Sequence, residues 1–198
     1  MDGYWIRPVL PNKQQWKFLT YNNGEYIDIG DVIQINGKPR PDPPHTEDVE
    51  VQSFKRIRRM SHVELINFLT KNAENNVQLF HTLNRNNRSL CVVQAENFRK
   101  VYTEEDPRRT RIAFKLPDSN YEYINDTSKP GYPCVCLHWR AIQGKGLALP
   151  ASFDRMFIAI GLARGFISAS GQRIEPAPMI ISVITNPKLP GDINYNDP

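Results

Sequence analysis

The 198-residue sequence has no long hydrophobic run and no leader-like start. It contains no stretch of about 18 consecutive apolar residues, the length that a membrane-spanning helix needs. Met1 is followed by Asp2 and then by Trp5-Ile-Arg-Pro, and not by the basic and then apolar residues of a secretory leader. We therefore expect a soluble, cytoplasmic protein with no membrane partner.

Cysteine is also scarce. The three cysteines, Cys91, Cys134 and Cys136, are odd in number and are not spaced like a disulfide framework, so a reducing compartment is expected. Cys134, Cys136 and His138 alternate and would share one face of a strand, where they could ligate a metal. Zinc sites, however, usually draw their cysteine pair from a turn with two intervening residues. The run is explained more simply as a strand over 134–139 that is buried on both sides.

Catalytic motifs are missing as well. The sequence has no nucleophile elbow, and Gly144-Lys-Gly146 is too short for a phosphate loop. His45, Glu47 and Asp48 lie close together and could hold a metal or move a proton, which leaves a metal-dependent hydrolase or nuclease as an alternative. The favoured interpretation is that Thr46 and Asp48 bond the backbone where a loop enters a strand. We therefore expect a binding module and not an enzyme, and we expect no cofactor.

The composition that is present favours a β protein. Hydrophobic residues make up 40% and charged residues 23% of the chain, which is ordinary for a globular protein. The 16 prolines and 11 glycines indicate many short, punctuated elements. The length fits one large domain or two small ones.

The stretch 30–59 organises the first half. Two alternating runs, around Val32–Ile35 and Val49–Phe54, flank a proline-rich loop and predict two strands. Asn23-Gly24 marks a hairpin turn before them. After them, Ser61 and Glu64 form a capping-box pattern, so we expect helices between about 61 and 83.

The second half returns to strand patterns, and a charged, proline-ended break at Glu104–Pro107 is the expected domain boundary. The final stretch, 187–198, is polar and rich in breakers and is expected to be a flexible tail. Apolar runs in this half predict strands at 90–93, 111–116, 121–124, 134–139, 157–162 and 179–184.

Three short pieces, Trp5–Val9, Pro44–Val49 and Gln94–Asn97, together resemble the markers of the dual OB-containing domain, a prokaryotic family. The resemblance extends from Tyr4 to about Ile184. It implies a mainly β protein with a small helical insertion and two tandem OB-like β-barrels. The first would span 1–104, with the insertion at about 61–83, and the second 107–186.

One departure from the family concerns the N-terminal side. A further strand usually precedes the Trp-Ile-Arg-Pro piece in this family, whereas here the sequence begins almost at it. The first barrel is therefore expected to be incomplete, closed differently, or completed by a partner strand at an open edge.

Positive charge gathers at the end of the second strand. The net charge of +4 and the pI near 9.0 permit nucleic acid as a partner. If the strand continues, Ile57 points inward while Arg56 and Arg58 share the opposite face. OB barrels bind single strands with basic grooves and stacking aromatics. The candidate nucleic-acid-binding residues are Lys55, Arg56, Arg58, Arg59, Arg108, Arg109, Arg111, Tyr21 and Tyr26.

The sequence thus favours a non-catalytic module that binds nucleic acid, single-stranded and with little sequence preference. The non-functional alternative is that these charges form a solvated face, or that Arg108 and Arg109 pair with Glu104 and Glu105. The main rival function is a protein-interaction or assembly subunit, which recruits a protein partner or forms a homo-oligomer through an open β edge.

Overall fold

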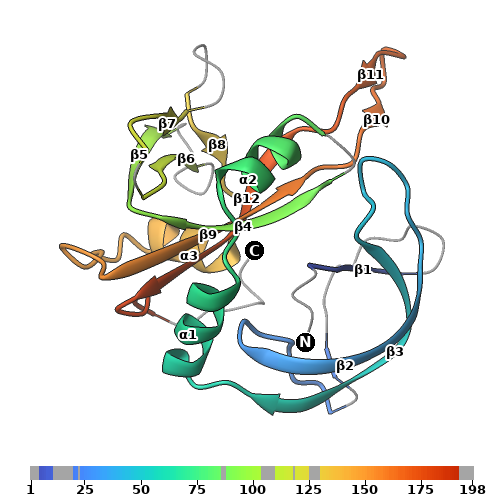
Figure 1. Ribbon diagram of the computed structural model, residues 1–198, viewed down its shortest axis with the longest axis horizontal. Coiled ribbons are helices and arrows are strands. Elements are labelled where there is room, and N and C mark those ends of the chain that lie inside the picture. The colour runs from blue at the N-terminus through green and yellow to red at the C-terminus, as the bar shows by residue number, and fades with distance from the viewer. Residues whose placement is uncertain are drawn as a thin grey trace.

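The computed structural model describes residues 5–10, 20–21, 23–85, 88–103, 110–117, 119–124 and 130–191. Strands dominate, and three short helices accompany them, so the protein is mainly β with a small helical insertion, as the sequence predicts (Figure 1). No helix in these ranges is both long and apolar enough to cross a membrane.

The first sheet is built on a long hairpin. β2 (Asp31–Pro39) and β3 (Asp48–Arg59) pair antiparallel around the proline-rich loop, which confirms the predicted strand, loop and strand. β1 (Arg7–Val9) adds to the other side of β3 in parallel, giving the order β1-β3-β2. In Figure 1 the hairpin curves as a ribbon around the lower right of the molecule.

The predicted helices follow the hairpin. α1 (His62–Asn72) begins at a complete Ser61–Glu64 capping box, and α2 (Asn76–Leu83) begins at an equivalent box formed by Asn75 and Gln78. Ile66 and Leu69 of α1 pack with Phe157, while Leu79 of α2 enters the main core. The helices therefore pack on the central sheet, and the helices expected between about 61 and 83 are confirmed.

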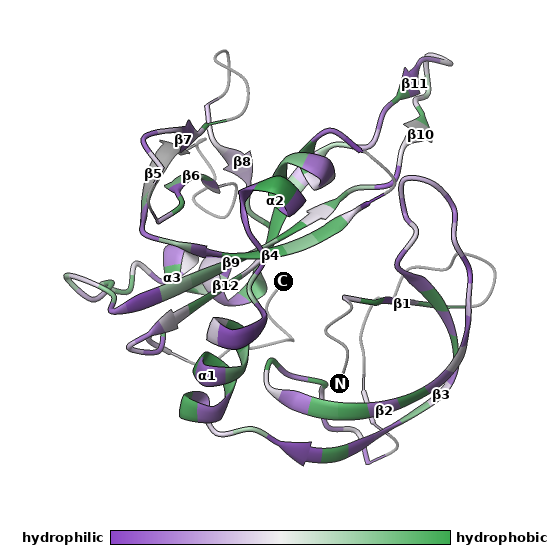
Figure 2. Ribbon diagram, viewed as in Figure 1, coloured by the Kyte–Doolittle hydropathy of each residue, from purple (hydrophilic) through white to green (hydrophobic). Residues whose placement is uncertain are grey.

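The central sheet has the order β12-β9-β4. It consists of β4 (Leu90–Ala95), β9 (Arg155–Leu162) and β12 (Pro178–Asn186), and all but the first residue of β9 are buried. Figure 2 shows these strands as the most continuous hydrophobic region. β4 precedes and β9 follows the boundary expected at Glu104–Pro107, which lies outside the described residues. One sheet thus joins both parts of the chain.

Two smaller sheets complete the β structure. β5 (Asn97–Thr103), β6 (Thr110–Lys115) and β7 (Glu122–Tyr123) form one sheet, to which β8 (Tyr132–Pro133) adds beside β6. β10 (Phe166–Ile167) and β11 (Arg173–Ile174) form a hairpin of their own. None of the sheets traced through the described ranges closes into a barrel.

The predicted strand over 134–139 is wrong. Leu137–Gly144 forms helix α3, and Cys136 is its N-cap residue. Trp139 and Ile142, three residues apart, are almost fully buried, whereas Leu137 is 50% exposed. This spacing of buried residues is helical, and the alternation of Cys134, Cys136 and His138 resembled a strand only because it is so short. All three cysteines are free and buried.

The stretch 187–191 also differs from the expectation of a flexible tail. Leu189 is 4% exposed and belongs to the main core. The carbonyl oxygens of Pro190 and Gly191 accept hydrogen bonds from Nε2 of His138 at 3.0 and 3.1 Å. This segment therefore packs against the start of α3, while 192–198 lies outside the described residues.

Candidate nucleic-acid interface

The basic cluster, defined as Lys55, Arg56, Arg58 and Arg59, occupies the C-terminal end of β3. It lies opposite the first residues of β2, with Arg59 beside Asp31 and Lys55 beside Gln34. The structure therefore brings these four candidate residues together, as their proximity in sequence requires.

A β-bulge changes the direction in which side chains of the basic cluster point. Arg58 pairs with Val32 and Arg56 pairs with the next residue, Ile33, so Ile57 is an extra residue in β3. Ile57 is 56% exposed, and the expectation that it points inward is wrong. Strict alternation fails because a bulge inserts one residue without a partner.

Each arginine of the cluster has a carboxylate partner. Arg59 donates to both oxygens of Asp31, at 2.7 and 3.1 Å, and Arg58 donates to Glu64 at 3.0 Å. Arg56 pairs with Glu25. Lys55 is exposed, and no carboxylate partner is found for it in the described part of the chain. The positive charge of this surface is therefore largely compensated, and Lys55 is its clearest uncompensated charge.

Tyr21 lies beneath the cluster and joins it to an aromatic neighbour. The Arg56 guanidinium carbon is 5.0 Å from the centre of the Tyr21 ring, which fits a cation–π contact. The rings of Tyr21 and Phe54 are 5.9 Å apart and tilted by 55°. We call Tyr21, Phe54 and Arg56 the Tyr21 platform. Phe54 was missed by the sequence reasoning, although residues two apart on a strand share a face and Arg56 was already a candidate.

Asp31 connects the Tyr21 platform to Arg59. The Tyr21 hydroxyl donates to Asp31 Oδ2 at 3.0 Å. Burial and this contact with Asp31 raise the pKa of Tyr21 to about 12. Burial on its own would raise the pKa of Asp31, but hydrogen bonds from Arg59, the Asp28 N–H and Tyr21 hold that pKa below its ordinary value. Asp31 therefore stays ionised and holds the side chains of Tyr21 and Arg59 in place.

Among the other candidates, Arg111 lies apart from the cluster. Arg111 lies on β6, in a different sheet and on the opposite side of the molecule in Figure 1, where its Nε donates to the Pro130 carbonyl at 3.2 Å. Arg108 and Arg109 lie outside the described residues. Tyr26 forms an antiparallel bridge with Thr20 across the Asn23-Gly24 turn, which confirms the turn.

The group His45, Glu47 and Asp48 forms an ion-pair network. Asp48 is 2% exposed; it accepts from Arg7 Nε at 2.7 Å and also pairs with Arg164. The expectation that Asp48 bonds the backbone is therefore wrong. The carboxylate of Glu47 accepts from the backbone N–H and the hydroxyl of Ser89, each at 2.8 Å. With both carboxylates occupied and two guanidinium groups adjacent, the arrangement suits a structural contact better than a cation site.

His45 lies inside this network as a neutral ring. Burial, with the charges of Arg7 and Arg164, lowers the pKa of His45 to about 4. Neither ring nitrogen has a hydrogen-bond partner within the described ranges. A search of the same ranges finds no cluster of three or more histidine, cysteine or acidic side chains that could hold a metal.

The family profile of the dual OB-containing domain matches residues 1–130. The chain belongs to the dual OB-containing domain family. No curated protein and no solved structure matches the sequence. The match ends after β7, short of Ile184, so α3, β9 and β12 of this dual OB-containing domain protein lie beyond it.

The structure also explains why the marker pieces of the dual OB-containing domain occur together. Arg7, in the first piece, pairs with Asp48, in the second, through both the parallel β1–β3 register and the ion pair. Glu47 then binds the residues that begin β4, and the third piece, Gln94–Asn97, lies where β4 ends and β5 begins. The first two markers thus carry contacts that join β1, β3 and the start of β4.

Proposed function

We propose that this dual OB-containing domain protein is a non-catalytic module that binds single-stranded nucleic acid with little sequence preference. The observation that carries the proposal is the Tyr21 platform on the β2–β3 hairpin, at the end of the hairpin that bears the basic cluster. OB folds commonly bind oligonucleotides across one strand face and its neighbouring loops. A base can stack on an aromatic ring or on an arginine plane, and each stacked base contributes about 1–3 kcal/mol.

The carboxylates around the cluster are compatible with phosphate binding. Arg56, Arg58 and their partners Glu25 and Glu64 are partly or well exposed. Exposed ion pairs contribute only about 0.2–1 kcal/mol, so a phosphate can replace either carboxylate at small cost. Arg59 differs because its partner Asp31 has a fully buried side chain. We therefore assign phosphate contacts to Lys55, Arg56 and Arg58, and a positioning role to Arg59.

A fluorescence titration of a labelled oligonucleotide at several salt concentrations tests this function. Each lost phosphate contact should reduce the slope of log K against log salt by about 0.7 for a single strand. The double variant Arg56→Ala/Arg58→Ala should therefore bind more weakly across all sequences and flatten the slope by about 1.4. The matched control is Arg173→Ala on β11, because Arg173 is exposed and paired with Glu175 far from the cluster.

Binding of the oligonucleotide at low salt decides whether the proposed function holds. If the wild type fails to bind any oligonucleotide there, nucleic-acid binding is wrong. If Arg173→Ala lowers affinity as much as the double variant, the effect is one of net charge and the assigned interface is wrong.

A second candidate function rests on the open side of β2. This nine-residue strand has β3 as its only strand neighbour in the described part of the chain, and a free strand edge can recruit another chain. The protein would then act as an interaction or assembly subunit. Size-exclusion chromatography with light scattering tests it, because a strict monomer that co-purifies with no other protein would contradict it.

The proposal places the module in the cytoplasm and retains two OB-like units, 1–104 and 107–186. The three buried, free cysteines support a reducing compartment. Family membership supports the OB-like units. Because β4 pairs with β9, such units would share one core.

A further inference from the structure

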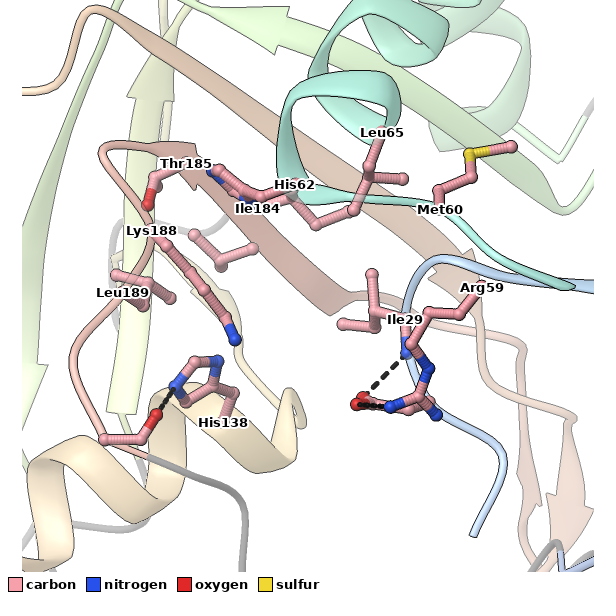
Figure 3. A pocket seen from close by; sticks show the side chains of 13 residues that line it. Ile29, Arg59, Met60, His62, Leu65, His138, Ile184, Thr185, Lys188 and Leu189 are labelled. Atoms are coloured by element: carbon pink, nitrogen blue, oxygen red, sulfur yellow. Dashed lines mark hydrogen bonds and ion pairs between the residues drawn. The ribbon is translucent and has the colours of Figure 1, made fainter.

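A pocket lies where four stretches that are distant in the sequence meet, namely 28–29, 59–65, 138 and 183–191. Its volume is about 240 Å³, below the range of about 300–1,000 Å³ of drug-sized sites, so it suits a small ligand. The end of β3, the start of α1, the start of α3 and the stretch after β12 each contribute a nitrogen-bearing side chain to its lining. In that order these are Arg59, His62, His138 and Lys188 (Figure 3).

The two positive charges of the pocket differ in whether they already have a carboxylate partner. Arg59 is held by Asp31, and Asp28 lies 3.6 Å from it. Lys188 is exposed, no carboxylate partner is found for it within the described ranges, and its side chain extends toward His138 in Figure 3. Lys188 is therefore the charge that is available to an anion.

The two histidines contribute nitrogens of different kinds. Nε2 of His138 must carry a proton, because both of its partners, the carbonyls of Pro190 and Gly191, can only accept. This bond fixes the ring and leaves Nδ1 for other partners. Nε2 of His62 is buried without a hydrogen-bond partner among the described residues, and an unpaired buried polar atom is unfavourable.

The rest of the lining is mostly apolar, apart from Thr185 and from Asp28, whose carboxylate faces Arg59. Ile29, Met60, Leu65, Val183 and Leu189 form walls between the nitrogen-bearing side chains. Donors from several directions suit the oxygens of a phosphate, and apolar walls suit an organic group attached to it. A carboxylate, which is planar and has two oxygens, would use fewer of these donors.

We propose that this pocket binds a small phosphate ester, with Lys188 contacting the phosphate, His62 in the pocket wall and Arg59 held in place by Asp31. The ester is either a free sugar or nucleoside phosphate or the phosphorylated end of a bound strand. The pocket shares Arg59 with the basic cluster but does not depend on the Tyr21 platform, so this proposal and the proposed function can fail separately.

Isothermal titration calorimetry of the full chain with ribose 5-phosphate tests the pocket, with ribose as the neutral control. Ribose 5-phosphate should bind and ribose should not. Lys188→Gln should weaken binding about tenfold, as expected for one lost hydrogen bond to a charged group. Lys188 is exposed, so this variant should fold. Lys145→Gln, which changes an exposed lysine outside both the pocket and the basic cluster, should bind like the wild type.

Two results would overturn the proposal. One is the absence of binding by ribose 5-phosphate at concentrations well above millimolar. The other is equal weakening by Lys188→Gln and Lys145→Gln, which would indicate a general effect of charge. Retained ribose 5-phosphate binding in Arg56→Ala/Arg58→Ala would show that the pocket acts independently of the strand-binding face.

Two oligonucleotides then distinguish the sources of the phosphate. If the ligand is a strand end, the wild type should prefer a 5′-phosphorylated oligonucleotide to its 5′-hydroxyl form, and Lys188→Gln should remove the preference. If the two forms bind equally while ribose 5-phosphate binds, the ligand is a free small ester. Either result supports a phosphate site.

Discussion

At the scale of single residues, Asp48 is a buried carboxylate that pairs with two arginines. Asp48→Asn should lower the free energy of unfolding by about 3 kcal/mol, because a buried carboxylate that pairs with Arg7 and Arg164 is lost. Urea unfolding measures the change. Glu50→Gln is the control, since its pair with Arg40 is about one-third exposed on both sides and should contribute less than about 1 kcal/mol. Equal effects of the two changes would contradict the importance of burial.

His45 predicts how stability depends on pH. Its folded pKa of about 4 lies below the ordinary value of 6.5, so between these values the unfolded chain binds a proton that the folded chain does not. The contribution of His45 to the free energy of unfolding is therefore fully present above pH 6.5. It declines as the pH falls toward 4, by at most about 1.4 kcal/mol per pH unit. His45→Phe, which cannot titrate, should flatten this part of the curve in urea unfolding at pH 4.5 and 7. An unchanged slope would mean that other groups cause the acid sensitivity.

At the scale of elements, the β2–β3 hairpin requires glycine at one position. A Cβ added to Gly37 would lie 2.6 Å from the Glu50 carbonyl oxygen and 2.8 Å from Val49 Cγ1, beside a shift in register. Gly37→Ala should therefore destabilise the protein by about 1–3 kcal/mol, since backbone must move. Thermal unfolding compares it with Asn36→Ala, an exposed neighbour that should be almost neutral. A neutral Gly37→Ala would show that the hairpin adapts easily.

The same elements show what the sequence can predict. The capping box at Ser61 and the alternation in β2 and β3 are local patterns, and the structure confirms them. The parallel pairing of Arg7 with Asp48 joins residues 41 apart in sequence, and no local pattern encodes it. The bulge at Ile57 changes the direction in which side chains of the basic cluster point, and no glycine in the sequence indicates a bulge there. Likewise, the pocket could not be predicted, because its nitrogen-bearing side chains come from three stretches that are far apart in the sequence.

At the scale of the whole molecule, the central sheet makes the two halves of the chain interdependent. Cys91 and Val93 precede the expected boundary and share one core with Ile158 and Ile180, which follow it. We therefore expect a single cooperative unfolding transition, with tryptophan fluorescence and far-ultraviolet circular dichroism changing together. Cleavage at a protease site introduced at 104–107 should leave two fragments that co-purify. Two separate transitions, or fragments that separate freely, would contradict a shared core.

The β4–β9 pairing also sets the order of events during synthesis. β4 carries the apolar run Leu90–Ala95, and its neighbour begins at Arg155, so the ribosome must add about 60 further residues before that partner exists. At about 5–20 residues per second, this interval lasts several seconds. During that time a nascent strand with unpaired edges is available to other chains. The yield of folded protein should therefore depend on chaperones that shield β4 until β9 leaves the ribosome.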